Sequence, residues 1–179
     1  MDAPETIETE RLVLRRARPE DAEAVFAYAS DPEVTRYMDW PTHVSVDTGR
    51  RFIEECAARW ASGEEFTWLV TVRPDDRALG AIAIRIRGEE ADFGYVLHRS
   101  AHGRGYATEA ARAVVEWALG LPSLRRITAT CDVENAASAR VLSKAGLSRE
   151  AVLPAYAARP NLGSGSRDAL LYGLDRRRP

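Results

Sequence analysis

Lysine is nearly absent from this chain of 179 residues, and cysteine and methionine are scarce. Lys144 is the one lysine, so almost all of the positive charge is carried by arginine. With 25 basic and 27 acidic residues the net charge is -2, which gives no reason to expect a nucleic-acid partner or an anionic membrane surface. Two cysteines, Cys56 and Cys131, are too few for a disulfide framework and are typical of a reducing compartment.

Membrane and targeting segments are also missing. No stretch approaches the roughly 18 apolar residues of a membrane span. The first ten residues are acidic and lack a basic region followed by an apolar run, so they predict no secretory signal. We therefore expect a cytoplasmic protein, a monomer or homodimer, with residues 1–179 forming a single domain. His43, His98 and His102 have no ligand-like spacing with either cysteine, so we expect no metal.

Hydrophobic periodicity predicts an α/β (α+β) fold. The expected strands cover residues 11–15, 66–72, 79–86, 91–97, 126–133, 147–153 and 168–174. The expected helices begin at Pro19, cover residues 45–61 and 107–119, and begin again at Asn135, ending at Gly146. This order of elements implies a mixed sheet with helices on both faces.

The most informative segment is the loop His102-Gly103-Arg104-Gly105-Tyr106-Ala107-Thr108-Glu109, between the strand over residues 91–97 and a helix. A helix start exposes unpaired N–H groups and the positive end of the helix dipole. Two glycines let a ligand approach this backbone closely, so the loop predicts a phosphate-binding site. A plain strand-to-helix turn is the alternative interpretation.

Other phosphate-binding patterns fit this loop poorly. Gly103 and Gly105 begin a GxGxxG pattern, but its third position is Thr108 and the preceding strands form a meander. The Gly-Lys-Ser/Thr sequence of nucleoside triphosphate loops is absent. Neither a dinucleotide nor a triphosphate site is therefore favoured.

A second segment, Asn135-Ala136-Ala137-Ser138-Ala139-Arg140-Val141-Leu142-Ser143-Lys144-Ala145-Gly146-Leu147, narrows the interpretation. Together with the loop it resembles the acetyl-CoA-binding motifs of the GNAT acetyltransferase superfamily. The family's loop pattern, Gln/Arg-x-x-Gly-x-Gly/Ala, corresponds to residues 102–107, with His102 in place of Gln or Arg. Three segments are similar to sequences of one branch of this family, the branch that contains the ribosomal-protein serine and alanine N-acetyltransferases. They are Gly-Tyr-Ala-Thr-Glu-Ala, the Asn-x-x-Ser helix start and the opening Arg-Leu-x-Leu-Arg.

The resemblance covers about residues 8–174 and implies a mostly antiparallel sheet of six to seven strands, splayed in the middle. It also implies acetyl-CoA as cofactor and co-substrate. The backbone of Tyr95, Val96 and Leu97 would pair with the pantetheine arm, and an N–H of Val96 or Leu97 would bind the thioester oxygen. The remaining expected cofactor contacts are His102, Gly103, Arg104, Gly105, Tyr106, Ala107, Thr108, Asn135, Ser138 and Arg140.

Many family members place a tyrosine general acid where this chain has Leu142, whereas the branch that it resembles uses a serine. We therefore expect Ser138 to donate a hydrogen bond or a proton to the departing sulfur; a serine bonded only to its own helix is the alternative. Cys131 is the second catalytic candidate, with a buried inert thiol as its alternative. No general base is assigned, although Asp132 and Glu134 are candidates for holding a water.

The acceptor is expected to bind among the less regular segments. Trp40, Trp68 and Tyr156 are its candidate contacts, and a core position is the alternative for each. The acceptor is an amine, either a protein N-terminus or a small molecule such as an aminoglycoside or polyamine. A non-catalytic acyl-CoA-binding module and a protein-interaction subunit are the alternative functions.

Overall fold

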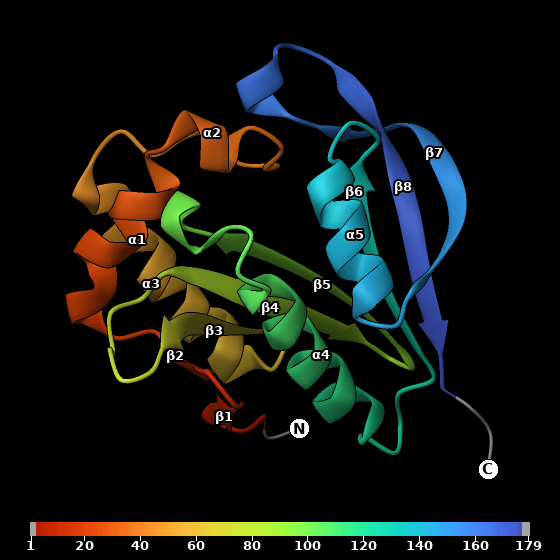
Figure 1. Ribbon diagram of the computed structural model, residues 1–179, viewed down its shortest axis with the longest axis horizontal. Coiled ribbons are helices and arrows are strands. Elements are labelled where there is room, and N and C mark those ends of the chain that lie inside the picture. The colour runs from red at the N-terminus through yellow and green to blue at the C-terminus, as the bar shows by residue number, and fades with distance from the viewer. Residues whose placement is uncertain (1–2, 177–179) are drawn as a thin grey trace.

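The computed structural model describes residues 3–176, which form one eight-stranded sheet with helices on both faces (Figure 1). The strands are β1 (Thr6–Glu8), β2 (Leu12–Arg16), β3 (Glu65–Val72), β4 (Gly80–Arg87), β5 (Glu90–Leu97), β6 (Arg126–Asp132), β7 (Ser148–Ala158) and β8 (Ser166–Asp175). The helices are α1 (Ala22–Ala29), α2 (Pro32–Thr35), α3 (Val46–Ser62), α4 (Tyr106–Leu119) and α5 (Ala136–Lys144), with short 3-10 turns η1 (Pro19–Asp21), η2 (Arg99–Ala101) and η3 (Pro160–Leu162). In this part of the chain, none of the helices has the length and apolar character that a membrane span needs.

The sheet opens in its middle, between β5 and β6. The strand order is β1-β2-β3-β4-β5-β6-β8-β7, and β5 with β6 is the parallel pair among antiparallel ones. This pairing covers only residues 90–92 and 126–128, after which the two strands diverge (Figure 1). The splayed, mostly antiparallel sheet that the resemblance implies is thus confirmed.

The expected number of strands was one too low. β1 pairs with β2 through Thr6 opposite Arg15, but three residues are too few for an alternating pattern to be seen in the sequence. β7 also continues to Ala158, beyond the expected end at residue 153, after an irregularity between Leu153 and Ala157.

Alternating side chains divide the core between the two faces of the sheet. Trp68 and Val70 of β3 pack in the cluster that includes α4, whereas Leu69 between them packs with α1 and α3. Trp68 meets Trp60 and Trp117 edge-on, with ring centres 5.2 and 5.4 Å apart. This packing holds β3 and β4 firmly beside β5, which borders the opening.

Candidate active site

The loop after β5 begins α4, as the sequence predicts. Gly103 and Gly105 have φ angles of +73° and +82°, which glycine adopts without a steric penalty. Gly105 is the N-cap, and no side chain caps the helix. Within residues 3–176, the N–H groups of Tyr106, Ala107 and Thr108 therefore have no hydrogen-bond partner. These groups and the helix dipole form a site that can bind an anion through the main chain.

An ion pair from the far end of the chain supports this loop. Glu109 accepts hydrogen bonds from Arg11 Nε at 2.7 Å and Thr9 Oγ1 at 2.6 Å. Arg11 Nη1 donates to the Arg104 carbonyl at 3.0 Å, and its guanidinium lies 4.8 Å from the centre of the Tyr106 ring. Partial burial alone would raise the pKa of Glu109, but the bonds from Thr9 and Arg11 outweigh burial and lower it. Glu109 is thus a carboxylate in the first turn of α4 that supports the loop through Thr9 and Arg11.

The register of β5 decides which of its backbone groups face the opening. His98 N–H donates to the Leu79 carbonyl at 2.6 Å, so the backbone N–H and C=O of His98 point toward β4. Because these directions alternate along a strand, the backbone groups of Val96 also point toward β4. Leu97 directs its groups the other way, and its carbonyl accepts a bond from His102 Nε2 at 2.8 Å. Two N–H groups were suggested as donors to the thioester oxygen. That of Leu97 faces the opening, whereas that of Val96 faces β4, which corrects the suggestion of Val96.

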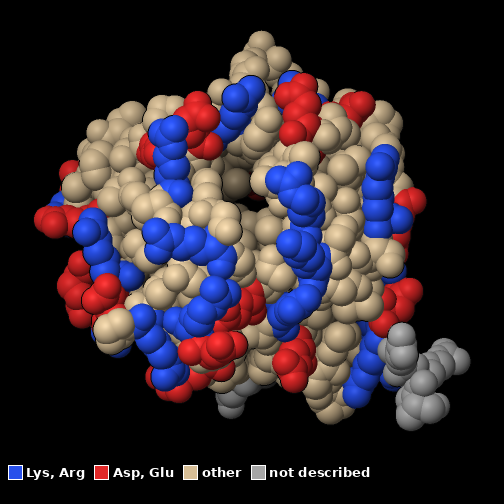
Figure 2. Space-filling view, in the orientation of Figure 1, with Lys and Arg blue, Asp and Glu red and all other residues tan. Residues whose placement is uncertain are grey.

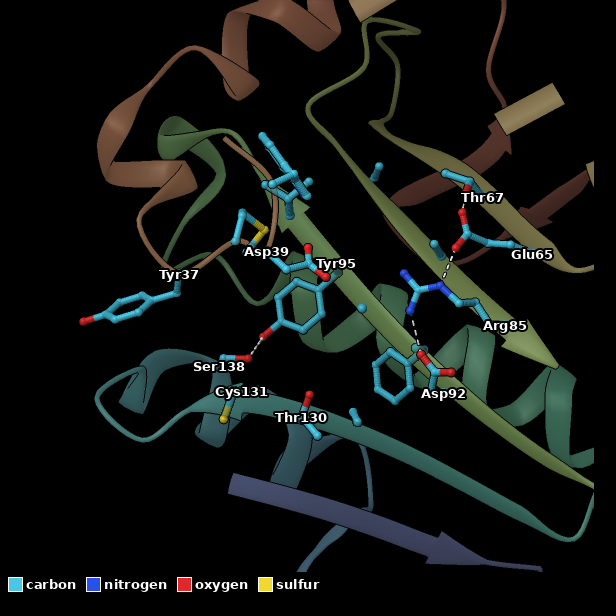
Figure 3. Close-up of a pocket in the computed structure, with 18 of the residues that line it drawn as sticks. Tyr37, Asp39, Glu65, Thr67, Arg85, Asp92, Tyr95, Thr130, Cys131 and Ser138 are labelled. Carbon is cyan, nitrogen blue, oxygen red and sulfur yellow. Dashed lines mark hydrogen bonds and ion pairs between the residues drawn. The ribbon is translucent and has the colours of Figure 1, made fainter. Parts of the chain in front are cut away.

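A cavity of about 950 Å³ lies where β5 and β6 diverge (Figure 3). Of the predicted site residues, its wall includes Trp40, Tyr95, Val96, Cys131, Asn135, Ser138 and Tyr156. Figure 2 shows arginine and lysine side chains on both sides of a hollow on the face that carries α4 and α5. Arg104 and Arg140 are exposed on the loop before α4 and on α5.

Tyr95, Ser138 and Cys131 meet in this cavity (Figure 3). Asn135 caps α5 by accepting a bond from Ser138 N at 3.0 Å, and Tyr95 Oη lies 3.0 Å from Ser138 Oγ, within hydrogen-bond distance. Burial raises the pKa of Tyr95 to about 12, so the phenol keeps its proton at neutral pH. Burial also raises the pKa of the Cys131 thiol, which therefore stays protonated. The hydroxyl of Tyr95 was not predicted, because the sequence suggested only a backbone role.

A chain of ion pairs lines the α3 side of the same cavity (Figure 3). Arg85 lies between Glu65 and Asp92, and its Nη1 donates to Asp92 at 2.7 Å. Glu65 is 5% exposed and also accepts from Arg59 at 3.1 Å. Sequence reasoning missed these residues, although charges in the middle of otherwise apolar strands are a signal for them. They give the cavity a polar wall whose charges are already paired.

Trp68 is not in the site, which corrects one predicted acceptor contact. Its side chain is fully buried in the α4 cluster, and its Nε1 donates to the Pro4 carbonyl at 2.9 Å. Trp40 and Tyr156 do line the cavity, and Tyr156 is 56% exposed. Trp40 packs on His43, with ring centres 5.2 Å apart.

Asn161 of η3 ties the end of the β7–β8 connection to the loop that carries Trp40. Its Nδ2 donates to the carbonyls of Thr35 at 2.8 Å and Trp40 at 2.9 Å. Its Oδ1 accepts from Thr42 N at 3.0 Å and Thr42 Oγ1 at 3.1 Å. Two segments more than a hundred residues apart therefore form one wall of the cavity.

Replacing Asn161 with alanine is expected to lower stability by about 2 kcal/mol, because four hydrogen bonds to part-buried groups in and before the Trp40 loop are lost. The melting temperature should fall by roughly 4–8 °C. Ser164→Ala, in the exposed part of the same connection, is the control and should melt within about 1 °C of the unchanged protein. Equal melting of the two variants in a thermal scan would contradict this structural role.

Comparison with known proteins agrees with this geometry. The family described as "Acetyltransferase (GNAT) domain" matches residues 11–148. An uncharacterized N-acetyltransferase of Bacillus licheniformis, p20, is 32% identical over 155 residues, which is 85% of this chain and 87% of that protein. The solved structure of a GNAT-family acetyltransferase from Bacillus anthracis has a TM-score of 0.83 at 26% identity and covers 96% of this chain and 98% of its own.

A further solved structure shares the fold. RimL, a ribosomal-protein α-N-acetyltransferase in complex with coenzyme A as a cysteine disulfide, has a TM-score of 0.85 at 20% identity and covers 96% of this chain and 98% of its own. The family match spans most of the chain, and p20 is related along most of its length. This chain therefore belongs to the GNAT family of acetyltransferases, which are acetyl-CoA-dependent acyltransferases.

Proposed function

We propose that this protein transfers an acetyl group from acetyl-CoA to a primary amine, by direct attack within a ternary complex. The observation that carries the proposal is the continuity between two features. The helix start that we propose as the anion site is joined to β5 by the short segment 98–105, and β5 also contributes to the wall of the cavity that holds Tyr95, Cys131 and Ser138. One extended molecule with a phosphate end and a reactive end would fit such an arrangement.

The chain offers suitable groups for each part of the cofactor. The pyrophosphate would lie on the N–H groups of residues 103–108, with Arg104 and Arg140 near its charges. The pantetheine arm would run along the open edge of β5 as an added strand, pairing with Tyr95 and Leu97. The Leu97 N–H would donate to the thioester oxygen as negative charge develops there.

Acetyl-CoA supplies an acetyl group that is activated as a thioester. Ser138 would donate the proton of Oγ to the departing sulfur while it accepts a hydrogen bond from the Tyr95 hydroxyl, and Oγ would regain its proton from the water that takes up the proton of the attacking amine. The cavity carboxylates of Glu65, Asp92 and Asp132 are each paired with an arginine, so these three are not free to act as a base. An α-amine with an ordinary pKa near ~8 can instead lose its proton to water at neutral pH.

We propose that Cys131 lies near the reacting groups but takes no part in the reaction. Its thiol lines the cavity next to Ser138 and is 4% exposed. RimL, which shares the fold, has been solved with coenzyme A joined to a cysteine, which supports a position for Cys131 near the sulfur of the cofactor. Because burial keeps the thiol protonated, we propose a packing role for Cys131 during turnover.

Calorimetry with acetyl-CoA and assays of thiol release with a panel of amines test the proposal. Gly105→Val strains a residue at φ +82° and places Cβ 3.3 Å from Arg11 Nη2, so acetyl-CoA affinity should fall by roughly 10- to 100-fold. Gly165→Val, at φ +114° in an exposed turn, is the control for backbone strain alone and should bind acetyl-CoA normally. Tight binding without release for any amine would favour a non-catalytic acyl-CoA-binding module, and unchanged binding by Gly105→Val would contradict the phosphate site.

A further inference from the structure

Arg159 is a cation on the cavity wall that no protein group pairs among the described residues. The residue is 8% exposed and lines the cavity, and within residues 3–176 it makes no side-chain hydrogen bond and no ion pair. Its nitrogen atoms are not among the fully buried atoms that lack a partner, so they contact the solvent in the cavity. Arg15, at 5% exposure, shows the contrast, because its guanidinium bonds to Asp21 at 2.8 Å and to Asp76 at 2.6 Å. The five N–H donors of the Arg159 guanidinium are therefore available to a ligand that enters the cavity.

Asp132, an acid that lines the same cavity as Arg159, is already satisfied. Asp132 has a fully buried side chain that accepts bonds from Arg167 Nε at 2.7 Å and Glu134 N at 2.9 Å. Arg159 and Cys131 line the same cavity, and the side-chain donors of Arg159 are left for something other than protein.

The backbone around Arg159 is held in place. Arg159 follows β7 and is the N-cap of η3, where its carbonyl accepts a bond from Leu162 N at 2.8 Å. Asn161, two residues on, is tied to the Trp40 loop by the four bonds described above. Two residues that line this cavity, Tyr28 and His43, each have a buried polar atom, Oη and Nδ1, without a partner among the described residues. The backbone that carries Arg159 is thus held in place before a ligand binds.

We propose that Arg159 binds an anionic group of the acceptor, so that the acetylated amine belongs to a molecule carrying a carboxylate or phosphate close to its amino group. The inference rests on the proposed function and narrows its substrate class. A guanidinium binds either anion through two parallel hydrogen bonds. Amino acids and aminoalkyl phosphates have this chemistry. Polyamines and aminoglycosides carry only positive charge, and Arg159 would repel them.

The test compares matched acceptors by thiol release from acetyl-CoA. Each common amino acid is paired with its carboxamide, and phosphoethanolamine is paired with ethanolamine; spermidine and kanamycin represent cationic amines. In the unchanged protein, kcat/KM should favour the anionic member by at least about tenfold, and the favoured pair identifies carboxylate or phosphate. Arg159→Ala should remove the preference by lowering kcat/KM for the anionic member roughly 10- to 1000-fold, with the neutral member changed less than about threefold.

Arg159→Lys should retain part of the preference, because it keeps the charge but not the paired donors. Arg77→Ala, at an exposed arginine between β3 and β4 that does not line the cavity, is the matched control and should behave like the unchanged protein. Three outcomes would overturn the inference in a protein that binds acetyl-CoA normally. The protein could prefer carboxamides or spermidine, it could acetylate no anionic acceptor, or the preference for anionic acceptors could survive in Arg159→Ala. Failure of the unchanged protein to bind acetyl-CoA in calorimetry refutes the proposed function instead.

Discussion

Replacing Gly80 with alanine is expected to destabilise the protein by about 3 kcal/mol, because there is no room for a side chain where β4 meets β5. A Cβ on Gly80 would lie 2.2 Å from the Val96 carbonyl oxygen and 2.9 Å from Leu97 Cα. Both are backbone atoms, so relief requires the strands to move apart. The melting temperature should fall by roughly 6–12 °C. Acetyl transfer should fall by about 100-fold, because the Leu97 N–H moves with its strand.

Gly94→Ala on the facing strand is the control for the loss of glycine itself. A Cβ at Gly94 meets no atom within 4 Å, and its φ lies outside the left-handed region. Its melting temperature should change by less than about 2 °C. If Gly80→Ala and Gly94→Ala melt at the same temperature in calorimetry, the close approach of β4 and β5 does not prevent a side chain at position 80.

The second large effect is expected from Ser138→Ala, which should lower kcat by about 10²- to 10⁴-fold. The substitution removes the hydroxyl that we propose as proton donor and leaves the Tyr95 phenol without its bond. Acetyl-CoA affinity should stay within about threefold, because the Asn135 cap on the backbone of residue 138 is retained. Steady-state kinetics and calorimetry on the same preparation separate the two quantities.

Ser143→Ala provides the matched control for Ser138→Ala. Ser143 is an exposed serine of α5 whose hydroxyl donates to the Ala139 carbonyl at 3.1 Å, and it does not line the cavity. Its kcat should be unchanged. Tyr95→Phe should fall between the two, with a loss of roughly tenfold, because Ser138 can still exchange protons with water. Full activity of Ser138→Ala would mean that this serine serves only its own helix.

Much of the fold could be predicted because its signals are local. Asn135 is predicted as an N-cap and Gly146 as a left-handed residue after the helix, and both are confirmed. The loop before α4 follows from Gly103 and Gly105 in the same way. In each case the residues that decide the conformation lie within one or two turns of it.

The errors involve contacts between distant segments. An aromatic residue on a strand reveals little about which face it lies on, so Trp68 was suggested as an acceptor contact although it packs against Trp60 and Trp117. Val96 and Leu97 could not be separated from the sequence, because a shift of one residue in register reverses their backbone directions. The register follows from the pairing of β5 with β4.

By itself, the sequence determined the order of the elements, the helix caps and the uncapped helix start of α4, because φ preferences and unpaired N–H groups belong to short segments. The tertiary structure alone decided that Tyr95 reaches Ser138, forty-three residues further along the chain. It also decided that Arg159 lines the cavity and has no hydrogen-bond or ion-pair partner among the described side chains. Such contacts depend on strand register and on segments that meet only when the sheet is complete.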